Sequence, residues 1–210
     1  MKHVVLLGDS IFDNASYVPG QPDVIRQTRT MLPADWKATL CAVDGAVTRG
    51  VSSQLKRIPP DASHLVISVG GNDALHASRI LHDSVRLVSE ALLKLSDIRE
   101  AFETDYRAML DAVMALNLPT TLCTIYEGYA LSDLQQRIQA TGLTVFNDVI
   151  LREAFFRRLS VIDLRFICND PDDYANPIEP SAKGGEKIAA VIAGAVAGPP
   201  DPSTPQVHVR

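Results

Sequence analysis

The amino-acid sequence predicts an α/β fold in which five parallel strands form a sheet with helices on both of its faces. Three observations lead to this prediction. Short apolar runs recur along the chain, each run is followed by turn-forming or polar residues, and a longer amphipathic segment leads to the next run. Strands and helices that alternate in this way are typical of a doubly wound, three-layer domain.

The predicted strands are apolar runs in which polar and apolar residues do not alternate. Such runs fit strands that are buried on both faces, as the strands of a parallel sheet are. They are residues 4–7, 38–43, 65–69, 120–125 and 161–164.

The predicted helices lie between these strands and after the last one. They cover residues 22–32, 51–57, 74–95, 98–116, 131–157 and 181–197, and the fifth is expected to break near Gly142. Beyond them the chain is rich in proline, which cannot continue a helix. We therefore expect one domain over residues 1–197 and a flexible tail over residues 198–210.

The composition narrows the class of protein. The net charge is −5 and no basic run occurs, which argues against a nucleic-acid partner. The apolar run before Gly8 is too short for a signal peptide, and no stretch approaches the roughly 18 apolar residues of a membrane span. Cys41, Cys123 and Cys168 are far apart and fit buried, reduced thiols. A cytoplasmic protein is expected.

In a doubly wound sheet of this flavodoxin-like kind, functional groups gather beyond the carboxyl ends of the strands. The loops that leave the predicted strands are therefore the places to look for a site. They begin at Gly8, Asp44, Gly70, Tyr126 and Arg165.

Ser10 follows the first predicted strand directly, in the stretch Gly8-Asp9-Ser10. At that position its hydroxyl is expected to be exposed at the functional edge, with its backbone N–H free to donate to an oxyanion. The glycine before it permits a tight turn. A serine at this place also serves as the N-cap of a helix, so the tripeptide alone does not establish a nucleophile.

Two further loops supply hydrogen-bond donors at the same edge. Gly45 follows the second strand and offers its backbone N–H, and Asn72 follows the third strand and offers its side-chain amide. Together with the N–H of Ser10, these groups form the three donors of an oxyanion hole, which stabilises the negative charge that develops on a reacting carbonyl oxygen.

These blocks resemble those of the SGNH (GDSL) hydrolase superfamily. Gly8-Asp9-Ser10 resembles its first block, Gly45 its second, and Gly70-Gly71-Asn72-Asp73 its third, G-x-N-D, block. The stretch from Asn176 to Pro180 is similar in frame to its last block, D-x-x-H-P, and is likewise followed by a glycine and a helix.

The resemblance covers residues 4–197, nearly the whole chain. It implies a serine esterase or lipase-like hydrolase that cleaves a small-molecule ester through an acyl-enzyme intermediate on Ser10. It implies no metal or organic cofactor.

The chain departs from the family at two positions. Asn176 stands where the family has aspartate, and Glu179 stands where it has the general-base histidine. In the family the imidazole accepts the serine proton and the carboxylate orients the imidazole. Because both residues change in a chemically consistent way, we expect Glu179 to act as the base and Asn176 to donate a hydrogen bond that holds it. Burial would raise the pKa of Glu179 and make it a better proton acceptor.

Two alternatives remain open. His76 follows the third block on the functional edge and is the rival base. The other histidines are expected at the surface, away from the site: His3, His64, His82 and His208. The second alternative is a catalytically inactive binding protein on a hydrolase scaffold, whose oxyanion loops hold an acyl or carboxylate ligand.

Two loops near the functional edge carry further polar residues. The acidic stretch Asp170-Pro171-Asp172-Asp173 does not have the spacing of an EF-hand, so a solvated loop is expected rather than a metal site. The stretch Tyr126-Glu127-Gly128-Tyr129 follows the fourth strand and is expected to line the substrate pocket.

Overall fold

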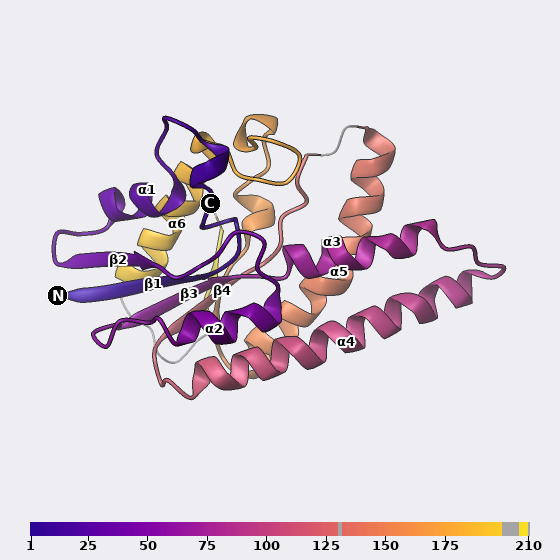
Figure 1. Cartoon of the computed structure of the whole chain (residues 1–210), viewed down its shortest axis with the longest axis horizontal. Helices are drawn as coiled ribbons and strands as arrows, with labels where there is room; N and C mark the ends of the chain where they lie inside the picture. The colour runs from indigo at the N-terminus through magenta and orange to yellow at the C-terminus, as the bar shows by residue number, and fades with distance from the viewer. Residues whose placement is uncertain (130–131, 199–205, 210) are drawn as a thin grey trace.

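The computed structural model of the chain describes residues 1–129, 132–198 and 206–209. At its centre is a parallel sheet in the order β2-β1-β3-β4-β5-β6 (Figure 1). The chain order reverses at β1, which lies between β2 and β3. The strands are β1 Lys2–Gly8, β2 Trp36–Leu40, β3 His64–Ser68, β4 Thr120–Cys123, β5 Ser160–Ile162 and β6 Val207–His208.

The sheet has six strands, so the prediction of five is wrong. The additional strand, β6, falls in the segment 198–210 that was expected to be a tail, and there Val207 pairs with Val161 and His208 with Ile162. A strand of two residues has no detectable periodicity, which is why the sequence pattern does not show it. Residues 199–205 and 210 lie outside the described part, so their flexibility stays a prediction.

The helices follow the predicted order with two differences. The structure has α1 Val24–Met31, α2 Val51–Leu55, α3 Gly71–Ala77, α4 Val88–Met114, α5 Asp133–Phe156 and α6 Ala182–Ala197. Shorter 3-10 helices are η1 Ala15–Tyr17, η2 Thr48–Gly50, η3 Ser78–His82, η4 Leu164–Phe166 and η5 Pro171–Asp173.

The first difference is the break in the long helical region, which was expected near residues 96–97 and lies at residues 83–87 instead. The second is that α5 runs through Gly142 without a break. A helical glycine costs about 1 kcal/mol relative to alanine, and the buried side chains of Phe146, Val149 and Ile150 in the same helix offset this cost.

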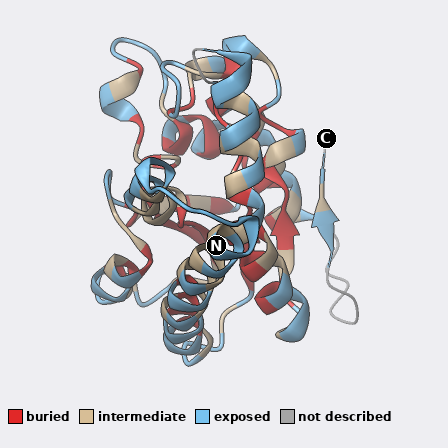
Figure 2. Cartoon of the chain, turned by 90° about the vertical axis from the view of Figure 1, so that its right-hand side faces the viewer, coloured by how far each residue is buried: buried red, intermediate tan, exposed pale blue. Residues whose placement is uncertain are grey.

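Alternate residues of β1 enter two separate cores, one on each face of the sheet. Val4 and Leu6 pack with residues of α1 and α6, whereas Val5 and Leu7 pack with residues of α4 and α5. Figure 1 shows α1 and α6 on one side of the sheet and α2 and α4 on the other. Figure 2 shows the buried residues concentrated along the strands and on the inward sides of the helices.

Three of the histidines expected at the surface depart from that expectation. His3 is only 2% exposed, and its ring nitrogens lie 2.8 Å from Thr39 Oγ1 and 3.1 Å from Asp61 Oδ1. His64 and His208 are half-buried because they lie within β3 and β6, and His82 is exposed as expected. A histidine at the start of a strand enters the sheet with its neighbours, so its place before an apolar run did not indicate exposure.

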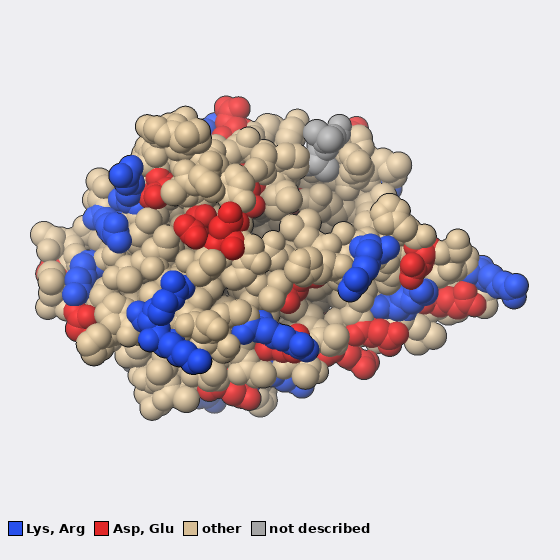
Figure 3. Space-filling model, in the orientation of Figure 1, with Lys and Arg blue, Asp and Glu red and all other residues tan. Residues whose placement is uncertain are grey.

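Basic and acidic side chains are interspersed over the face of the molecule that Figure 3 shows. None of the helices in the described part of the chain combines the length and apolar character needed to cross a lipid bilayer.

Candidate active site

Ser10 lies in a tight turn at the carboxyl end of β1. The backbone N–H groups of Phe12 and Asp13 both donate to the carbonyl of Asp9, and the N–H of Ser10 has no hydrogen-bond partner among the described residues. Ser10 is 6% exposed and lines a cavity. Its hydroxyl therefore opens to this cavity rather than to bulk solvent, which differs from the exposure expected.

Gly8 makes the turn before Ser10 possible. Its φ of +127° favours glycine, and a Cβ built on it would lie 1.7 Å from the carbonyl oxygen of Ser68 in the neighbouring strand. The side chain of Gln54 accepts the N–H of Gly8 at 2.8 Å and donates to its carbonyl at 2.7 Å. The end of β1 is thus held rigidly on both sides.

Glu179 meets Ser10 across the fold. The hydroxyl of Ser10 donates a hydrogen bond to Oε1 of Glu179 at 3.1 Å, although the two residues are 169 positions apart in the chain. The other carboxyl oxygen, Oε2, is buried and has no hydrogen-bond partner among the described residues. Burial raises the pKa of Glu179, the hydrogen bond from Ser10 opposes this shift, and the negative charge of Asp44 adds to it.

The loop that carries Glu179 is anchored to the strand ends around it. The hydroxyl of Tyr126, after β4, donates to the carbonyl of Ile178 at 2.5 Å. The side chain of Asn14, which is fully buried, donates to the carbonyl of Pro180 at 3.1 Å and accepts the N–H of Val24. These contacts hold Glu179 in register with the turn at Ser10. The role of Asn14 has no signature in the sequence, because it depends on a contact with Pro180, which is distant in the chain.

Asn176 holds the same loop, but not in the way expected. Its Oδ1 accepts the backbone N–H groups of Ile178 and Glu179, each at 2.9 Å. No hydrogen bond joins it to the carboxyl group of Glu179 in the described structure. Asparagine side chains favour this short-range bonding to the backbone two or three residues onward, which is a stable local turn.

The two other predicted donors lie in loops that contact each other. Gly45 occupies an exposed turn with a φ of +75°, and its N–H has no partner among the described residues. The side chain of Asn72 donates to the carbonyl of Ala46, the residue after Gly45, at 3.0 Å. Asn72 lines the cavity beside Ser10, whereas Gly45 does not. The contact between Asn72 and Ala46, together with the hydrogen bonds from Thr48 to the Asp73 carboxylate, joins these two loops.

A second carboxyl group, Asp9, lies next to Ser10 and was not singled out from the sequence. It is 2% exposed, lines the cavity and accepts the N–H of Ile11 at 3.2 Å. Burial, with the nearby carboxylates of Glu179 and Asp73, raises its pKa to about 8 against the opposing hydrogen bond from the N–H of Ile11. Two carboxyl groups with raised pKa values therefore border the same cavity.

The rival base, His76, is exposed on α3 and does not line this cavity. No other histidine of the described residues lines it either.

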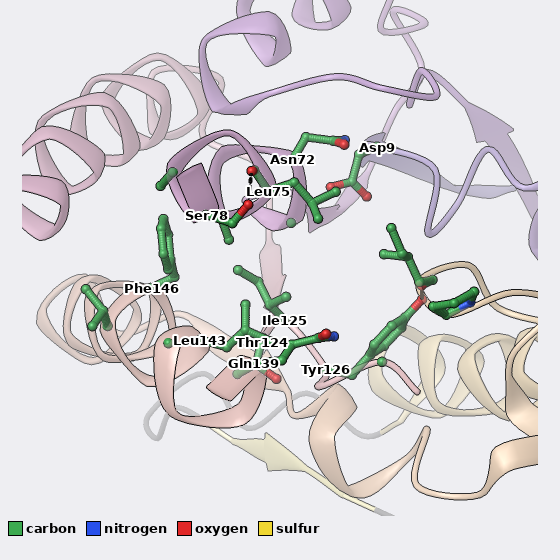
Figure 4. A pocket seen from close by; sticks show the side chains of 18 of the residues that line it. Asp9, Asn72, Leu75, Ser78, Thr124, Ile125, Tyr126, Gln139, Leu143 and Phe146 are labelled. Carbon is green, nitrogen blue, oxygen red and sulfur yellow. Dashed lines mark hydrogen bonds between the residues drawn. The ribbon is translucent and has the colours of Figure 1, made fainter. Parts of the chain in front are cut away.

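The cavity has a volume of about 480 Å³ and extends from Ser10 to α4 and α5. Figure 4 shows Asp9 and Tyr126 on one side of it and Phe146 on the opposite side. Of the loop after β4, Tyr126 and Gly128 line the cavity, whereas Glu127 and Tyr129, which were also expected to do so, do not. Its other walls are largely apolar.

The acidic loop is not simply solvated, as was expected. Asp173 is fully buried, and its Oδ2 accepts hydrogen bonds from the N–H groups of Asn169 and Asp170 and from Lys187 Nζ at 2.6 Å. Its role is to fasten the loop before Glu179 to helix α6. In the described part of the chain, no group of three or more acidic, histidine or cysteine side chains is arranged to hold a metal ion.

Solved structures with the same fold cover nearly the whole chain. An extracellular lipase from Streptomyces rimosus is 18% identical, with a TM-score of 0.66, over 93% of this chain and 99% of that one. A lipase from a goat rumen metagenome is 16% identical, with a TM-score of 0.71, over 94% and 98%. A carbohydrate acetylesterase from Sinorhizobium meliloti is 12% identical, with a TM-score of 0.64, over 94% and 99%. At these identities the likeness shows the fold.

A comparison with curated proteins finds no match. The GDSL-like Lipase/Acylhydrolase family, in contrast, matches residues 6–187, a span that includes the Ser10 turn, the Asn72 loop and Glu179. The chain therefore belongs to the GDSL-like lipase/acylhydrolase family.

Proposed function

We propose that the protein is a serine esterase that hydrolyses an ester through an acyl-enzyme intermediate on Ser10, with Glu179 as the general base. The observation that carries this proposal is the hydrogen bond of 3.1 Å from Ser10 Oγ to Glu179 Oε1 at the edge of a cavity. A nucleophile in direct contact with a proton acceptor is the arrangement that acyl transfer requires. Family membership and the esterase and lipase folds above support the same reaction class.

In the first half of the reaction, Ser10 Oγ attacks the carbonyl carbon of the ester while its proton passes to Glu179. The carbonyl oxygen becomes an oxyanion. When the tetrahedral intermediate collapses, the bond to the alcohol oxygen breaks and the Glu179 carboxylic acid gives its proton to that oxygen. The alcohol leaves, and the acyl group stays on Ser10.

In the second half, a water molecule attacks the acyl carbon and gives its proton to Glu179. The new tetrahedral intermediate expels Ser10 Oγ, which takes the proton back from Glu179. A free carboxylic acid is released, and both residues return to their starting protonation states.

The oxyanion would be stabilised by the N–H of Ser10, the N–H of Gly45 and the side-chain amide of Asn72. Both backbone N–H groups are without partners among the described residues. Asn72 uses one amide hydrogen on Ala46 and, since an amide group has two, retains a second for the substrate.

Glu179 can take the place of histidine because its surroundings raise its basicity. An ordinary glutamate has a pKa about two units below that of histidine and is a correspondingly weaker base. Burial raises the pKa of Glu179, and its Oε2 has no hydrogen-bond partner among the described residues, so the carboxylate is a stronger base than an exposed glutamate. Asn176 contributes by fixing the backbone of Glu179 rather than its carboxyl group.

The proposal is tested with a fluorophosphonate probe and with p-nitrophenyl acetate. The wild type should be labelled on Ser10 and should hydrolyse the ester. Ser10→Ala should keep the fold and lose both the labelling and several orders of magnitude in activity. Ser53→Ala, which changes an exposed serine of α2, is the matched control and should behave as the wild type.

Full esterase activity in Ser10→Ala would contradict the proposal. A wild type that neither reacts with the probe nor hydrolyses the ester would instead indicate the alternative, an inactive binding protein on the same scaffold.

A further inference from the structure

We propose that the cavity beside Ser10 binds the acyl chain of a medium-chain fatty ester, of about eight carbons, so that the enzyme prefers such esters to acetates. This inference rests on the function proposed above and specifies its substrate class.

The walls of the cavity have the chemistry of an acyl-chain site. Its far part is enclosed by side chains from η3, α4 and α5, none of which can form a hydrogen bond with a substrate: Ile80, Leu81, Leu95, Ile98, Leu143 and Phe146. Ser10, Asp9, Asn72 and Glu179 lie at the end of the cavity that holds the nucleophile. Ser78 and Gln139 also line the cavity, and their side chains donate to the carbonyls of Leu75 and Glu127. One reactive end and one apolar end match an ester that carries an alkyl chain.

The apolar surface around the cavity is incompletely covered in the protein alone. Leu81 is 62% exposed and Leu75 is 45% exposed, although both border the cavity. An alkyl chain in the cavity would remove part of this surface from water, which is favourable. A polar group would not gain this contribution from the apolar side chains of the wall.

The position of Glu179 indicates which half of the ester occupies the apolar part. The alcohol oxygen must receive a proton from Glu179, so the alcohol must lie on the side of that carboxyl group. The apolar part of the cavity extends away from Glu179, toward Leu95 and Phe146. The group that remains on Ser10, the acyl chain, is therefore the one that enters it.

The volume agrees with a chain of medium length. A methylene group is similar in size to a water molecule, which takes up about 30 Å³ in the liquid. Eight such groups need ~240 Å³. The cavity, at about 480 Å³, has about twice this volume, and the other half includes the end at Ser10 and Glu179 where the reacting carbonyl group and the alcohol must lie. An acetyl group would leave most of the apolar walls in contact with water.

The first test is a series of p-nitrophenyl esters from acetate to dodecanoate. We expect kcat/KM to rise about fourfold for each added methylene, because each one is transferred from water to an apolar site, and to stop rising near eight carbons. Values of kcat/KM that stay level or fall between acetate and octanoate would overturn the inference while leaving the esterase function intact.

The second test narrows the cavity from α5. Gly142 lines the cavity, and no atom of the described residues lies within 4 Å of the position of a Cβ there, so Gly142→Leu adds a side chain at the cavity wall with no clash at its Cβ. Leucine also favours a helix more than glycine does, so the fold is not at risk. The ratio of kcat/KM for octanoate to that for acetate should fall at least tenfold. Gly194→Leu, at an equally open helical glycine in α6 that does not line the cavity, should leave this ratio unchanged.

A binding measurement separates the inference from the proposed function. Octanamide and acetamide are neutral and carry a carbonyl group, and their binding to the wild type can be followed by calorimetry without turnover. Octanamide should bind at least a hundredfold more tightly than acetamide, and Gly142→Leu should remove most of this difference. If the wild type shows this preference for octanamide but has no esterase activity, the assignment of the cavity is supported and the proposed esterase function is wrong. Equal, weak binding of both amides would overturn the cavity assignment.

Discussion

Among the individual residues, Glu179 and Asn176 set this chain apart from the Asp-x-x-His frame that its last block resembles. In the structure Glu179 contacts the nucleophile with its carboxyl group, and Asn176 contacts the backbone of Glu179. The two residues therefore act on different parts of the site. In the proposed mechanism, a residue that bonds only the backbone of the general base does not need a charge, so an asparagine at position 176 is compatible with that mechanism.

This division of roles predicts the behaviour of Glu179→Gln. Glutamine keeps the shape of the side chain but cannot accept the serine proton, so kcat should fall by at least about 10². In the wild type, kcat/KM should decrease as the pH falls through the pKa of Glu179, because only the carboxylate accepts a proton. Burial raises that pKa, so the decrease should begin above the pH at which an exposed glutamate titrates.

The matched control for this change is Glu186→Gln, which alters an exposed glutamate of α6 and should leave kcat unchanged.

The double variant Asn176→Asp with Glu179→His rebuilds the Asp-x-x-His pair and should retain esterase activity near neutral pH. Glu179→His alone should have lower activity than the double variant, because its imidazole lacks a charged orienting group. Should Glu179→Gln remain fully active while His76→Ala does not, the base would be His76.

Asn72→Ala tests the proposed oxyanion hole by removing one of its three hydrogen-bond donors. Removing a donor to charge that appears mainly in the transition state should lower kcat by about 10²–10³ and move KM little. Steady-state kinetics with p-nitrophenyl esters separate the two constants, and a thermal melt controls for loss of the contact with Ala46. A raised KM at an unchanged kcat would instead place Asn72 in ground-state binding.

Among the elements, α6 carries the contact that positions the Glu179 loop. Gly184, in its first turn, lies against the backbone of Asp173, and a Cβ there would be 2.1 Å from the Asp173 carbonyl oxygen. That carbonyl accepts the N–H of Ser181, the N-cap of α6, and the Asp173 side chain is paired with Lys187. The helix and the loop before it therefore form one closely packed unit.

Two glycines of α6 give a matched pair of variants. Gly184→Ala should destabilise the fold by about 1–3 kcal/mol, because the backbone of Asp173 must move, and should lower esterase activity by displacing Glu179. Gly194→Ala meets nothing within 4 Å and should stabilise the fold by about 0.5–1 kcal/mol. Denaturant unfolding measures both changes. Equal stabilities of the two variants would show that the contact with Asp173 is not tight.

The long helical region shows what element-scale patterns can and cannot predict. Its helical character follows from the sequence, but the break lies at residues 83–87 and not near residues 96–97. The position of the break depends on the contacts of the segment, since Glu90 accepts the N–H of Arg86 and Asp83 pairs with Lys94. The helix propensities of the individual residues do not include the effect of these side-chain contacts.

For the molecule as a whole, the buried carboxyl group of Asp9 should link stability to pH. Its pKa is about 8 in the folded protein and near 3.8 when exposed, so between these values the folded state binds one proton that the unfolded state does not. The free energy of unfolding should therefore fall as the pH rises from about 4 to about 8, by up to about 1.4 kcal/mol per pH unit from this group.

Asp9→Asn has no proton to bind at this position, so its stability should not depend on pH through this group. Between pH 5 and pH 7 the free energy of unfolding of the variant should therefore rise relative to that of the wild type. Asp97→Asn, at an exposed aspartate of α4, serves as the control and should show no such trend. Urea unfolding at several pH values measures it. A difference that is constant over this range would mean that Asp9 does not change its protonation on folding.

The sequence by itself determined the order of strands and helices, the five longer strands of the sheet and the loops that carry Ser10, Asn72 and Glu179. It could do so because buried parallel strands and glycine-bearing turns leave local patterns that do not depend on distant residues. The family to which the chain belongs follows from the same local blocks.

The tertiary structure alone decided how those loops meet. The contact of Ser10 with Glu179, the anchoring by Asn14 and Tyr126, the burial of Asp9 and the cavity between η3, α4 and α5 all join segments that are far apart in the chain. The sixth strand also depends on its partner, since two residues form a strand only where β5 offers an open edge. Such features arise from packing and desolvation, which act between residues that the sequence separates and the fold brings together.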